Sequence, residues 1–134
     1  LKRYGSVQIR NVATIAGNIA TASPIGDNLP LLLALDSKVV LQSVKKSKIL
    51  PINDFFLSYR KTKLKAGQFI HSIRIPIFEK NIFKAYKISK RYDDDISSVW
   101  GSFNIEIDKK RIKKIKIAFL GYPTYWIAHE ISYC

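Results

Sequence analysis

The sequence has few of the residues that crosslink a chain or anchor it in a membrane. Its single cysteine is the last of 134 residues, which excludes a disulfide framework and a cysteine-based metal site within it. The longest apolar run, residues 29–35, contains Pro30 and is far shorter than the ~20 residues that span a bilayer. The start is basic, lacks methionine and is not followed by an apolar signal segment. We expect a cytoplasmic protein, cut from a longer polypeptide.

Acidic residues are also scarce, because 10 Asp and Glu stand against 23 Lys and Arg, for a net charge of +13. Such an excess suggests an anionic partner, such as nucleic acid, an acidic protein or a phosphorylated cofactor. Lysine is abundant together with isoleucine and asparagine, as in proteins of AT-rich genomes, and solvated lysines explain the charge equally well. A hydrophobic fraction of 47% argues against general disorder.

Basic residues alternate with aromatic residues in two segments, residues 59–65 and 84–92. Proteins that bind single-stranded nucleic acid combine a basic groove with aromatic stacking platforms. A small basic module for nucleic acid or another polyanion is therefore one hypothesis for the function. The nearby aromatic residues fall on the apolar sides of their segments, however, and we expect four of them in the core: Phe55, Phe56, Phe83 and Tyr86.

Short helices are predicted in the first half of the chain. Residues 6–22 read as one helix that ends at the Ser23–Pro24 step, because a residue before proline avoids the helical region. Residues 28–35 read as a second helix, with Asn28 as its N-cap and a proline in its first turn. A brief helix is expected to begin near residue 53.

The rest of the chain has the alternating pattern of strands. Six segments show it: residues 38–43, 47–51, 69–77, 83–89, 99–107 and 112–119. The first two and the last two are expected to form hairpins, the last pair joined by the polar turn at residues 108–111. The predicted fold class is therefore α+β, with short helices followed by a mainly antiparallel β-sheet.

The most distinctive segment is residues 7–27, which is rich in small and hydroxylated residues. Small side chains allow backbone N–H groups to approach a flat ring or a phosphate, and hydroxyls add hydrogen bonds at little steric cost. Judged by residue types alone, a short helix followed by a turn explains the segment as well.

The order of residues in four blocks resembles the FAD-binding domain of the xanthine dehydrogenase and molybdenum hydroxylase family. The blocks are RNVATIAGNIATASPIGD at residues 10–27, and residues 52–62, 69–76 and 83–96. The YKISKR segment within the last block is most similar to the small subunit of bacterial xanthine dehydrogenase. The resemblance implies the second half of a PCMH-type FAD-binding domain at residues 1–78. Residues 79–134 would then begin a domain like the C-terminal domain of the CO dehydrogenase flavoprotein.

Four of the six FAD-binding residues implied by this resemblance lie in the first block, and three of these come before its final turn. Thr14 matches a position whose backbone or hydroxyl touches the flavin. Asn18 and Thr21 are three residues apart on the predicted helix and so share a face, where the family contacts FAD.

The fourth implied residue of the first block is Asp27, and the remaining two lie further along the chain. Asp27 matches an acid that hydrogen-bonds near the ribityl or adenosine portion, although it could instead cap a helix. Ile70 matches the aliphatic residue against the isoalloxazine ring, although a strand residue there could simply pack in the core. Lys87 matches a lysine at the flavin, where a cation would stabilise the reduced, anionic form.

The resemblance also implies the role of the whole enzyme. FAD passes electrons from [2Fe–2S] clusters to NAD⁺, while a large subunit oxidises the substrate at molybdopterin. The clusters and the glycine-rich pyrophosphate loop would lie upstream of this chain, in a missing N-terminal half and an iron–sulfur domain. The charged loop at residues 90–95 would lie near the flavin and affect the approach of NAD, or be a merely solvated loop.

No catalytic residue and no metal ligand is assigned to this chain. His71 and His129 stand alone, and no Ser-His-Asp arrangement suggests covalent catalysis. Two residues depart from the family pattern, since Ala16 replaces a glycine and Gln68 an acid. The resemblance fades after Phe119, as in a truncated gene. We expect a fragment that is not active alone, with an inactive gene remnant as a further alternative.

Overall fold

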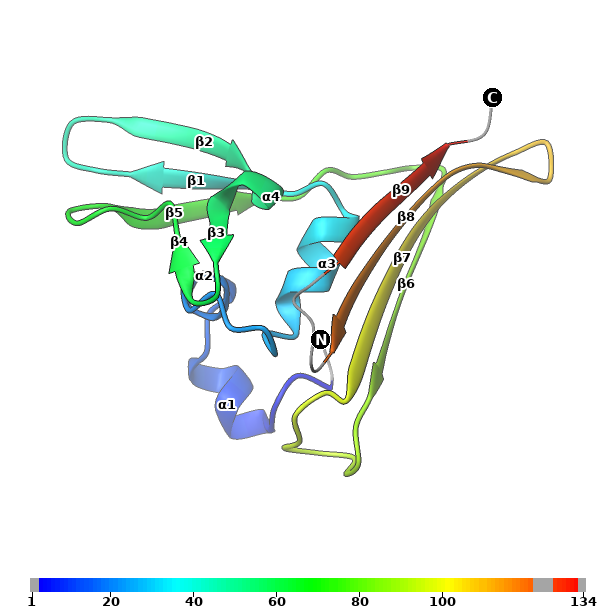
Figure 1. The fold of residues 1–134 in the computed structure, drawn as a ribbon, viewed down its shortest axis with the longest axis horizontal. Coiled ribbons are helices and arrows are strands. Elements are labelled where there is room, and N and C mark those ends of the chain that lie inside the picture. Colours follow the sequence, from blue (N-terminus) through cyan, green and yellow to red (C-terminus); the bar gives the residue numbers. More distant parts are fainter. Residues whose placement is uncertain (1–2, 122–126, 133–134) are drawn as a thin grey trace.

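The computed structural model describes residues 3–121 and 127–132, and places α3 between two diverging sheets (Figure 1). The helices are α1 (Val7–Val12), α2 (Ile15–Ala20), α3 (Asn28–Ala34) and α4 (Ile52–Phe55). The strands are β1 (Lys38–Gln42), β2 (Ser47–Pro51), β3 (Phe56–Ser58), β4 (Lys61–Thr62), β5 (Phe69–Arg74), β6 (Asn81–Ile88), β7 (Val99–Asp108), β8 (Arg111–Gly121) and β9 (Ile127–Ser132). The α+β class is confirmed.

The helix predicted over residues 6–22 is wrong, because the structure divides it into α1 and α2. Ala13 and Thr14 between them have extended backbone, with ψ of 149° at both. The hydroxyl of Thr14 accepts a hydrogen bond from the backbone N–H of Gly17 at 2.9 Å and so caps α2. A threonine hydroxyl satisfies an N–H group that has no partner within the helix, which favours a new helix start here.

The start of α3 also differs from the prediction. Asn28 is the first residue of the helix rather than its N-cap, which is Asp27. Although Asp27 holds the N-cap position, its side chain makes no capping hydrogen bond. The alternative role of this carboxylate as a helix cap is therefore excluded. Pro30 lies in the first turn as expected, and most of α3 is buried.

The three-stranded sheet has the order β2-β1-β5 and is antiparallel throughout, which confirms the predicted β1–β2 hairpin. The brief helix α4 follows β2, one residue earlier than expected. The small β3–β4 pair that comes next was not predicted, because its strands are only three and two residues long.

The four-stranded sheet has the order β6-β7-β8-β9, in which every neighbour is antiparallel. The predicted β7–β8 hairpin is confirmed, and its turn residues Lys109 and Lys110 both have positive φ. Strand β9 was not predicted, because the family resemblance had faded before it. Residues 122–126, which were included in the expected truncation, lie outside the described residues.

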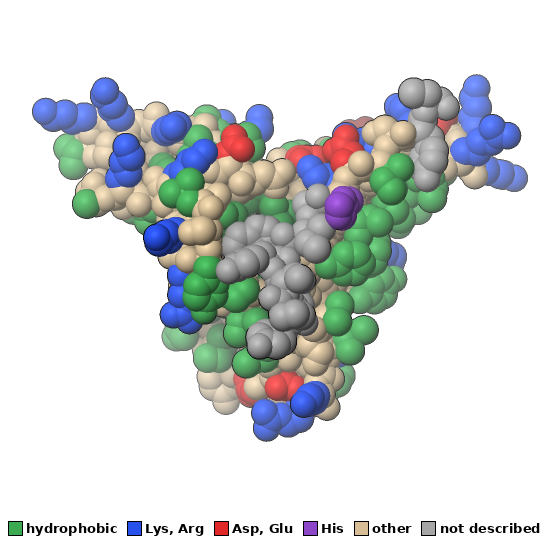
Figure 2. Space-filling model, viewed as in Figure 1, with side chains coloured by type: hydrophobic (Ala, Val, Ile, Leu, Met, Phe, Trp, Pro, Cys, Tyr) green, Lys and Arg blue, Asp and Glu red, His purple; other side chains and the backbone are tan. Residues whose placement is uncertain are grey.

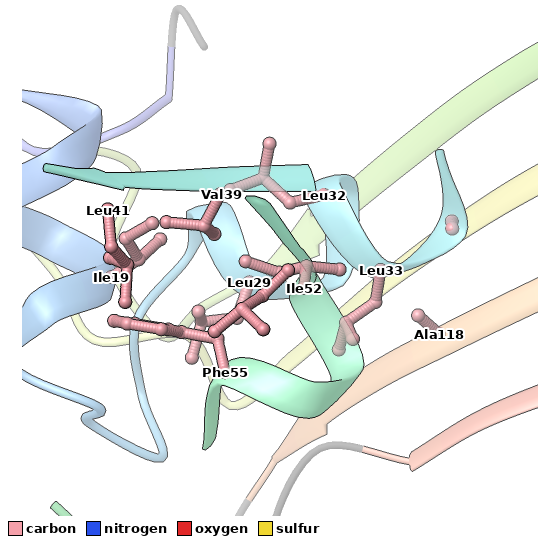
Figure 3. Packing of buried hydrophobic residues seen from close by; sticks show 11 residues of the cluster. Ile19, Leu29, Leu32, Leu33, Val39, Leu41, Ile52, Phe55 and Ala118 are labelled. Atoms are coloured by element: carbon pink, nitrogen blue, oxygen red, sulfur yellow. The ribbon is translucent and has the colours of Figure 1, made fainter. Parts of the chain in front are cut away.

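One apolar core joins the helices to both sheets (Figure 3). Ile19 of α2, Leu29 of α3 and Phe55 of α4 are fully buried, and Ala118 of β8 brings the larger sheet into the same cluster. Phe56 and Phe83 pack against this cluster, as expected. The prediction was wrong for Tyr86, which is 59% exposed on the side of the sheet that α3 does not cover.

The space-filling view shows two arms that correspond to the two sheets (Figure 2). Lysine and arginine side chains gather at the far ends of both arms, and hydrophobic side chains follow the arm of the four-stranded sheet. Further lysine and arginine side chains lie along the side and at the base of the molecule, so on this face the positive charge is not confined to one patch.

Candidate functional site

A buried ion pair connects the start of α3 to strand β6. The Nζ atom of Lys87 lies 2.7 Å from Oδ2 of Asp27, and only 4% and 8% of the two side chains are exposed. The hydroxyl of Ser97 donates a hydrogen bond of 2.5 Å to Oδ1 of the same carboxylate. Buried charges are tolerated when they are paired and hydrogen-bonded, so each of these three groups fixes the others.

A tight turn before α3 brings Asp27 to this position. The N–H of Gly26 donates to the carbonyl oxygen of Ser23 at 3.1 Å. A Cβ atom at Gly26 would lie 3.2 Å from that carbonyl oxygen and 3.5 Å from Oδ1 of Asn18. A side chain at this position would be tightly packed, so the turn favours glycine and lies close to Asn18 of α2.

A second set of side-chain hydrogen bonds begins at Asn28, next to Asp27, and leads toward the N-terminus. Asn28 donates a hydrogen bond of 3.1 Å to Oδ1 of Asn18, and Asn18 donates one of 3.3 Å to the hydroxyl of Tyr4. Tyr4 and Ser97 were missed by the sequence analysis. The only signal for Tyr4 was an aromatic residue just before the segment of small residues, and Ser97 gave none.

Four of these residues line an open cleft of about 450 Å³, which we call the polar cleft. Three of the six predicted residues meet in it, Asn18, Asp27 and Lys87, together with Tyr4. Residues 94–96 form part of its rim. The structure thus brings an amide, a carboxylate, an ammonium group and a phenol from distant parts of the sequence to one hollow.

The other predicted residues lie outside the polar cleft. Thr14 lines a smaller hollow of about 150 Å³ that shares Tyr4 with it. Thr21 is exposed, and its hydroxyl donates to the carbonyl oxygen of Asn18 at 2.7 Å. Ile70 lies on β5 opposite Leu41, half-buried, and packs against the core. Neither Thr21 nor Ile70 lines these two hollows.

The charged loop after β6 is exposed to solvent at residues 90–94 and is held by hydrogen bonds from Arg3. The guanidinium of Arg3 donates to the hydroxyl of Ser89 at 3.1 Å and to the carbonyl oxygen of Tyr92 at 2.8 Å. It also lies 4.4 Å from the centre of the Tyr92 ring. The backbone N–H of Arg91 donates to Asp95, which lowers the pKa of that carboxyl group.

The arrangement suits a polar ligand that both donates and accepts hydrogen bonds. Among the described residues, no group of three or more metal-ligating side chains occurs. In the same part of the chain, no helix has the length and hydrophobicity needed to cross a bilayer. The chemistry available in the polar cleft is therefore recognition by charge and hydrogen bonds.

Comparison with known protein families identifies the family to which the chain belongs. Residues 1–78 match the family described as the FAD-binding domain in molybdopterin dehydrogenase. The chain belongs to this FAD-binding family. Residues 84–132 match a second family, the CO dehydrogenase flavoprotein C-terminal domain. The sequence-based assignment to the xanthine dehydrogenase and molybdenum hydroxylase family, with FAD as its cofactor, is confirmed.

Two curated relatives align with almost the whole chain. Nicotinate hydroxylase hnxS of Emericella nidulans is 40% identical over 98% of this chain, and xanthine dehydrogenase of Blastobotrys adeninivorans is 42% identical over 96%. The chain spans only 10% and 9% of the lengths of these FAD-binding family members. The specific similarity to the bacterial small subunit remains a prediction.

Solved structures of the family share the fold. The carbon monoxide dehydrogenase of Hydrogenophaga pseudoflava matches 95% of this chain and 44% of its own, with a TM-score of 0.88 and 23% identity. Quinoline 2-oxidoreductase of Pseudomonas putida 86 matches 96% of this chain and 44% of its own, with a TM-score of 0.83 and 20% identity. At these identities the likeness concerns the fold alone.

Proposed function

We propose that the polar cleft is part of the binding site for FAD, with Asn18 and Lys87 as cofactor-binding residues. The convergence of Asn18, Asp27 and Lys87 in one hollow carries the proposal, because Asp27 and Lys87 are 60 residues apart along the chain and the family resemblance implies all three as contacts to FAD. Thr14, Thr21 and Ile70 are proposed as further contacts at the margins of the site.

The donors and acceptors of the cleft fit this cofactor. The ribityl hydroxyls and ring carbonyls of FAD need both kinds of partner, and a phosphate needs donors or a cation. Lys87 and Asn18 supply donors, whereas the phenol of Tyr4 both donates and accepts. The close turn at Gly26 keeps the wall of the cleft free of a side chain.

Asp27 acts mainly by holding Lys87. Each of its carboxylate oxygens already accepts a short hydrogen bond, one from Lys87 and one from Ser97. The pair fixes the ammonium group at the wall of the cleft, where a positive charge favours electron-rich ligand atoms. Asp27 is thus a positioning residue for the cation.

Bound FAD supplies electron transfer, in which electrons from [2Fe–2S] clusters reach NAD⁺ as the acceptor. We propose this role for the complete protein, together with partners that carry the iron–sulfur clusters and molybdopterin, and a cytoplasmic location. Within it, residues 1–78 would belong to the FAD-binding domain and residues 79–134 to the CO dehydrogenase flavoprotein C-terminal-like domain. The matches to the two families and the names of the relatives support this division.

The proposal is tested by measuring retention of FAD on the purified chain, from its visible absorbance after unbound flavin is removed. Lys87→Ala and Asn18→Ala should each weaken binding about tenfold or more, because each removes a hydrogen-bond donor from the cleft. Lys84→Ala is the matched control, since Lys84 is an exposed lysine on the opposite side of the same strand.

The outcomes separate the alternatives. Circular dichroism of each variant distinguishes a lost contact from a lost fold. Equal retention in Lys87→Ala, Asn18→Ala and the parent chain would contradict the assignment. A folded chain that remains colourless would support an inactive remnant instead. If Lys84→Ala weakens binding as much as Lys87→Ala and Asn18→Ala do, and if added salt also weakens it, the polyanion-binding module is favoured.

A further inference from the structure

The hydroxyl of Ser97 lies behind the wall of the polar cleft, just after the charged loop. Ser97 is 3% exposed, and it lines neither the polar cleft nor the smaller hollow beside it. Its hydroxyl donates to Oδ1 of Asp27 at 2.5 Å and makes no other hydrogen bond in the part of the chain that the structure describes. The N–H of Ser98 donates to the carbonyl oxygen of Ile88 at 2.8 Å, which ties this segment to the end of β6. Ser97 can therefore affect a ligand in the polar cleft only through Asp27.

The hydrogen bond from Ser97 fixes the orientation of the Asp27 carboxylate. The terminal torsion of an aspartate side chain has a broad preference, so a carboxylate that is bound through one oxygen can still rotate. Ser97 holds Oδ1, which leaves Oδ2 facing Nζ of Lys87 at 2.7 Å. Hydrogen bonds to an ionised carboxylate are about twice as strong as those between neutral groups. The ion pair therefore has one fixed geometry.

Lys87 has few restraints apart from this ion pair. Its side chain borders the polar cleft and also a larger hollow of about 750 Å³ between α3 and β6. Asp27 is the only hydrogen-bond acceptor of its ammonium group among the described residues, and the centre of the Trp100 ring lies 5.8 Å away. Because lysine has a flexible four-carbon stem, the ammonium group would leave the polar cleft if its partner were not fixed.

We propose that Ser97 is a positioning residue for the cation at the flavin, and that it thereby sets the reduction potential of bound FAD. This inference rests on the proposed FAD site. Ser97 orients Asp27, and Asp27 holds the ammonium group of Lys87 at the wall of the polar cleft. A cation fixed there favours the reduced, negatively charged form of the cofactor and makes its potential less negative. The hydroxyl of Ser97 stays bound to Asp27 and takes part in no step of the reaction.

The first experiment needs no cofactor. The purified chain is treated with acetic anhydride, and acetylation of Lys87 is followed by mass spectrometry of the peptide that contains it. Reaction should be slow in the parent chain, because only 4% of the Lys87 side chain is exposed. Ser97→Ala should accelerate it about fivefold, since the carboxylate can then rotate and release the ammonium group. Ser102→Ala is the matched control, because it removes a buried hydroxyl that has no hydrogen-bond partner among the described residues.

The second experiment measures the midpoint potential of FAD retained by the same chains, by spectroelectrochemical titration. Ser97→Ala should give a more negative potential than the parent chain and Ser102→Ala. Ser97→Thr keeps the hydroxyl and should restore both the potential and the slow acetylation of Lys87. A hydroxyl that only stabilised the fold would change the urea midpoint without changing the potential.

The outcomes separate this inference from the FAD site on which it rests. Acetylation of Lys87 at the parent rate in folded Ser97→Ala would overturn the inference, whether or not FAD binds. Faster acetylation with an unchanged potential would overturn the effect on the flavin. A parent chain that retains no FAD would overturn the proposed function, while acetylation would still decide whether Ser97 holds Lys87. If circular dichroism shows that Ser97→Ala does not fold, Ser97→Cys has only a weak donor and should show the same changes at smaller size.

Discussion

The two faces of the four-stranded sheet differ in composition and in burial. The inner face, covered by α3, buries polar side chains such as Asn104 and Lys116 beside apolar ones such as Leu120. The outer face carries apolar residues that remain substantially exposed, among them Tyr86 at 59% and Ile88 at 62%. A one-sided antiparallel sheet ordinarily exposes a polar face, so the exposed apolar residues of the outer face depart from that rule.

Two buried polar side chains on the inner face have specific partners near the end of α3. The amide of Asn104 donates to the carbonyl oxygen of Ala34 at the end of α3, at 3.1 Å, and Lys116 pairs with Asp36 just beyond it. The outer face instead depends on neighbours within the sheet. The ring of Phe103 packs edge-on against Tyr86 at 6.1 Å and Phe119 at 5.7 Å. Burial here follows the position of α3 rather than residue type.

Two adjacent residues of β8 test this comparison with the largest expected effect. Leu120 faces inward and is 1% exposed, whereas Phe119 faces outward and is 41% exposed. Leu120→Ala should lower the free energy of unfolding by about 3 kcal/mol, because it leaves a cavity in a covered face. Phe119→Ala should cost about 1 kcal/mol, because water already reaches much of the ring. Urea denaturation followed by circular dichroism measures both.

The order of these two effects is the informative result. An equal or larger loss in Phe119→Ala would mean that the outer face is covered in solution, for example by self-association. Sedimentation of the parent chain at several concentrations separates that case from an error in the assignment of the inner face.

A smaller effect is expected at Gly101, which lies beneath the aromatic rings of the outer face. A Cβ atom there would lie 2.9 Å from Cε1 of Phe119 and 3.2 Å from Cε2 of Phe103. Gly101→Ala should therefore cost roughly 1 kcal/mol, because the rings must move. Addition of Phe119→Ala should recover part of this loss, so that the two changes are not additive in urea denaturation. Strict additivity would show that the rings do not restrict position 101.

The sequence was sufficient to predict six of the nine described strands, but not which face of the larger sheet is covered. Alternation identified the segments that became β6, β7 and β8, because a period of two is visible in any strand. It assigned Tyr86 to the core because alternation separates two faces without showing which one meets a helix. The break between α1 and α2 was missed although Thr14 carried the signal of a helix start.

The candidate site depended on the family resemblance for its residues and on the structure for their partners. The resemblance selected Asn18, Asp27 and Lys87, which the fold brings together. Tyr4 and Ser97 contact them across 14 and 70 residues of sequence, and no local pattern records such separations. The ion pair itself was also unforeseen, since a charge excess of one sign suggests solvated lysines rather than a buried one.

The smallest expected effect lies at the hairpin end of the sheet, beyond α3. Glu106 there pairs with Lys113 at 2.8 Å, and their side chains are 31% and 59% exposed. The hydrogen bond from Lys113 lowers the pKa of Glu106. A lowered pKa means a contribution to stability that is complete above the unfolded-state value of about 4.3 and is lost as the pH falls through the lower folded-state value.

Glu106→Gln should therefore make the thermal unfolding midpoint fall less when the pH is lowered. Its effect on stability should be smaller than that of Leu120→Ala or Phe119→Ala on β8. The difference between the variant and the parent chain should shrink in about 1 M salt, because exposed pairs are screened. The buried Asp27–Lys87 pair is the internal comparison, since salt has little access to it. A difference that persists in high salt would show that the hairpin end is shielded from solvent in the same way as the inner face.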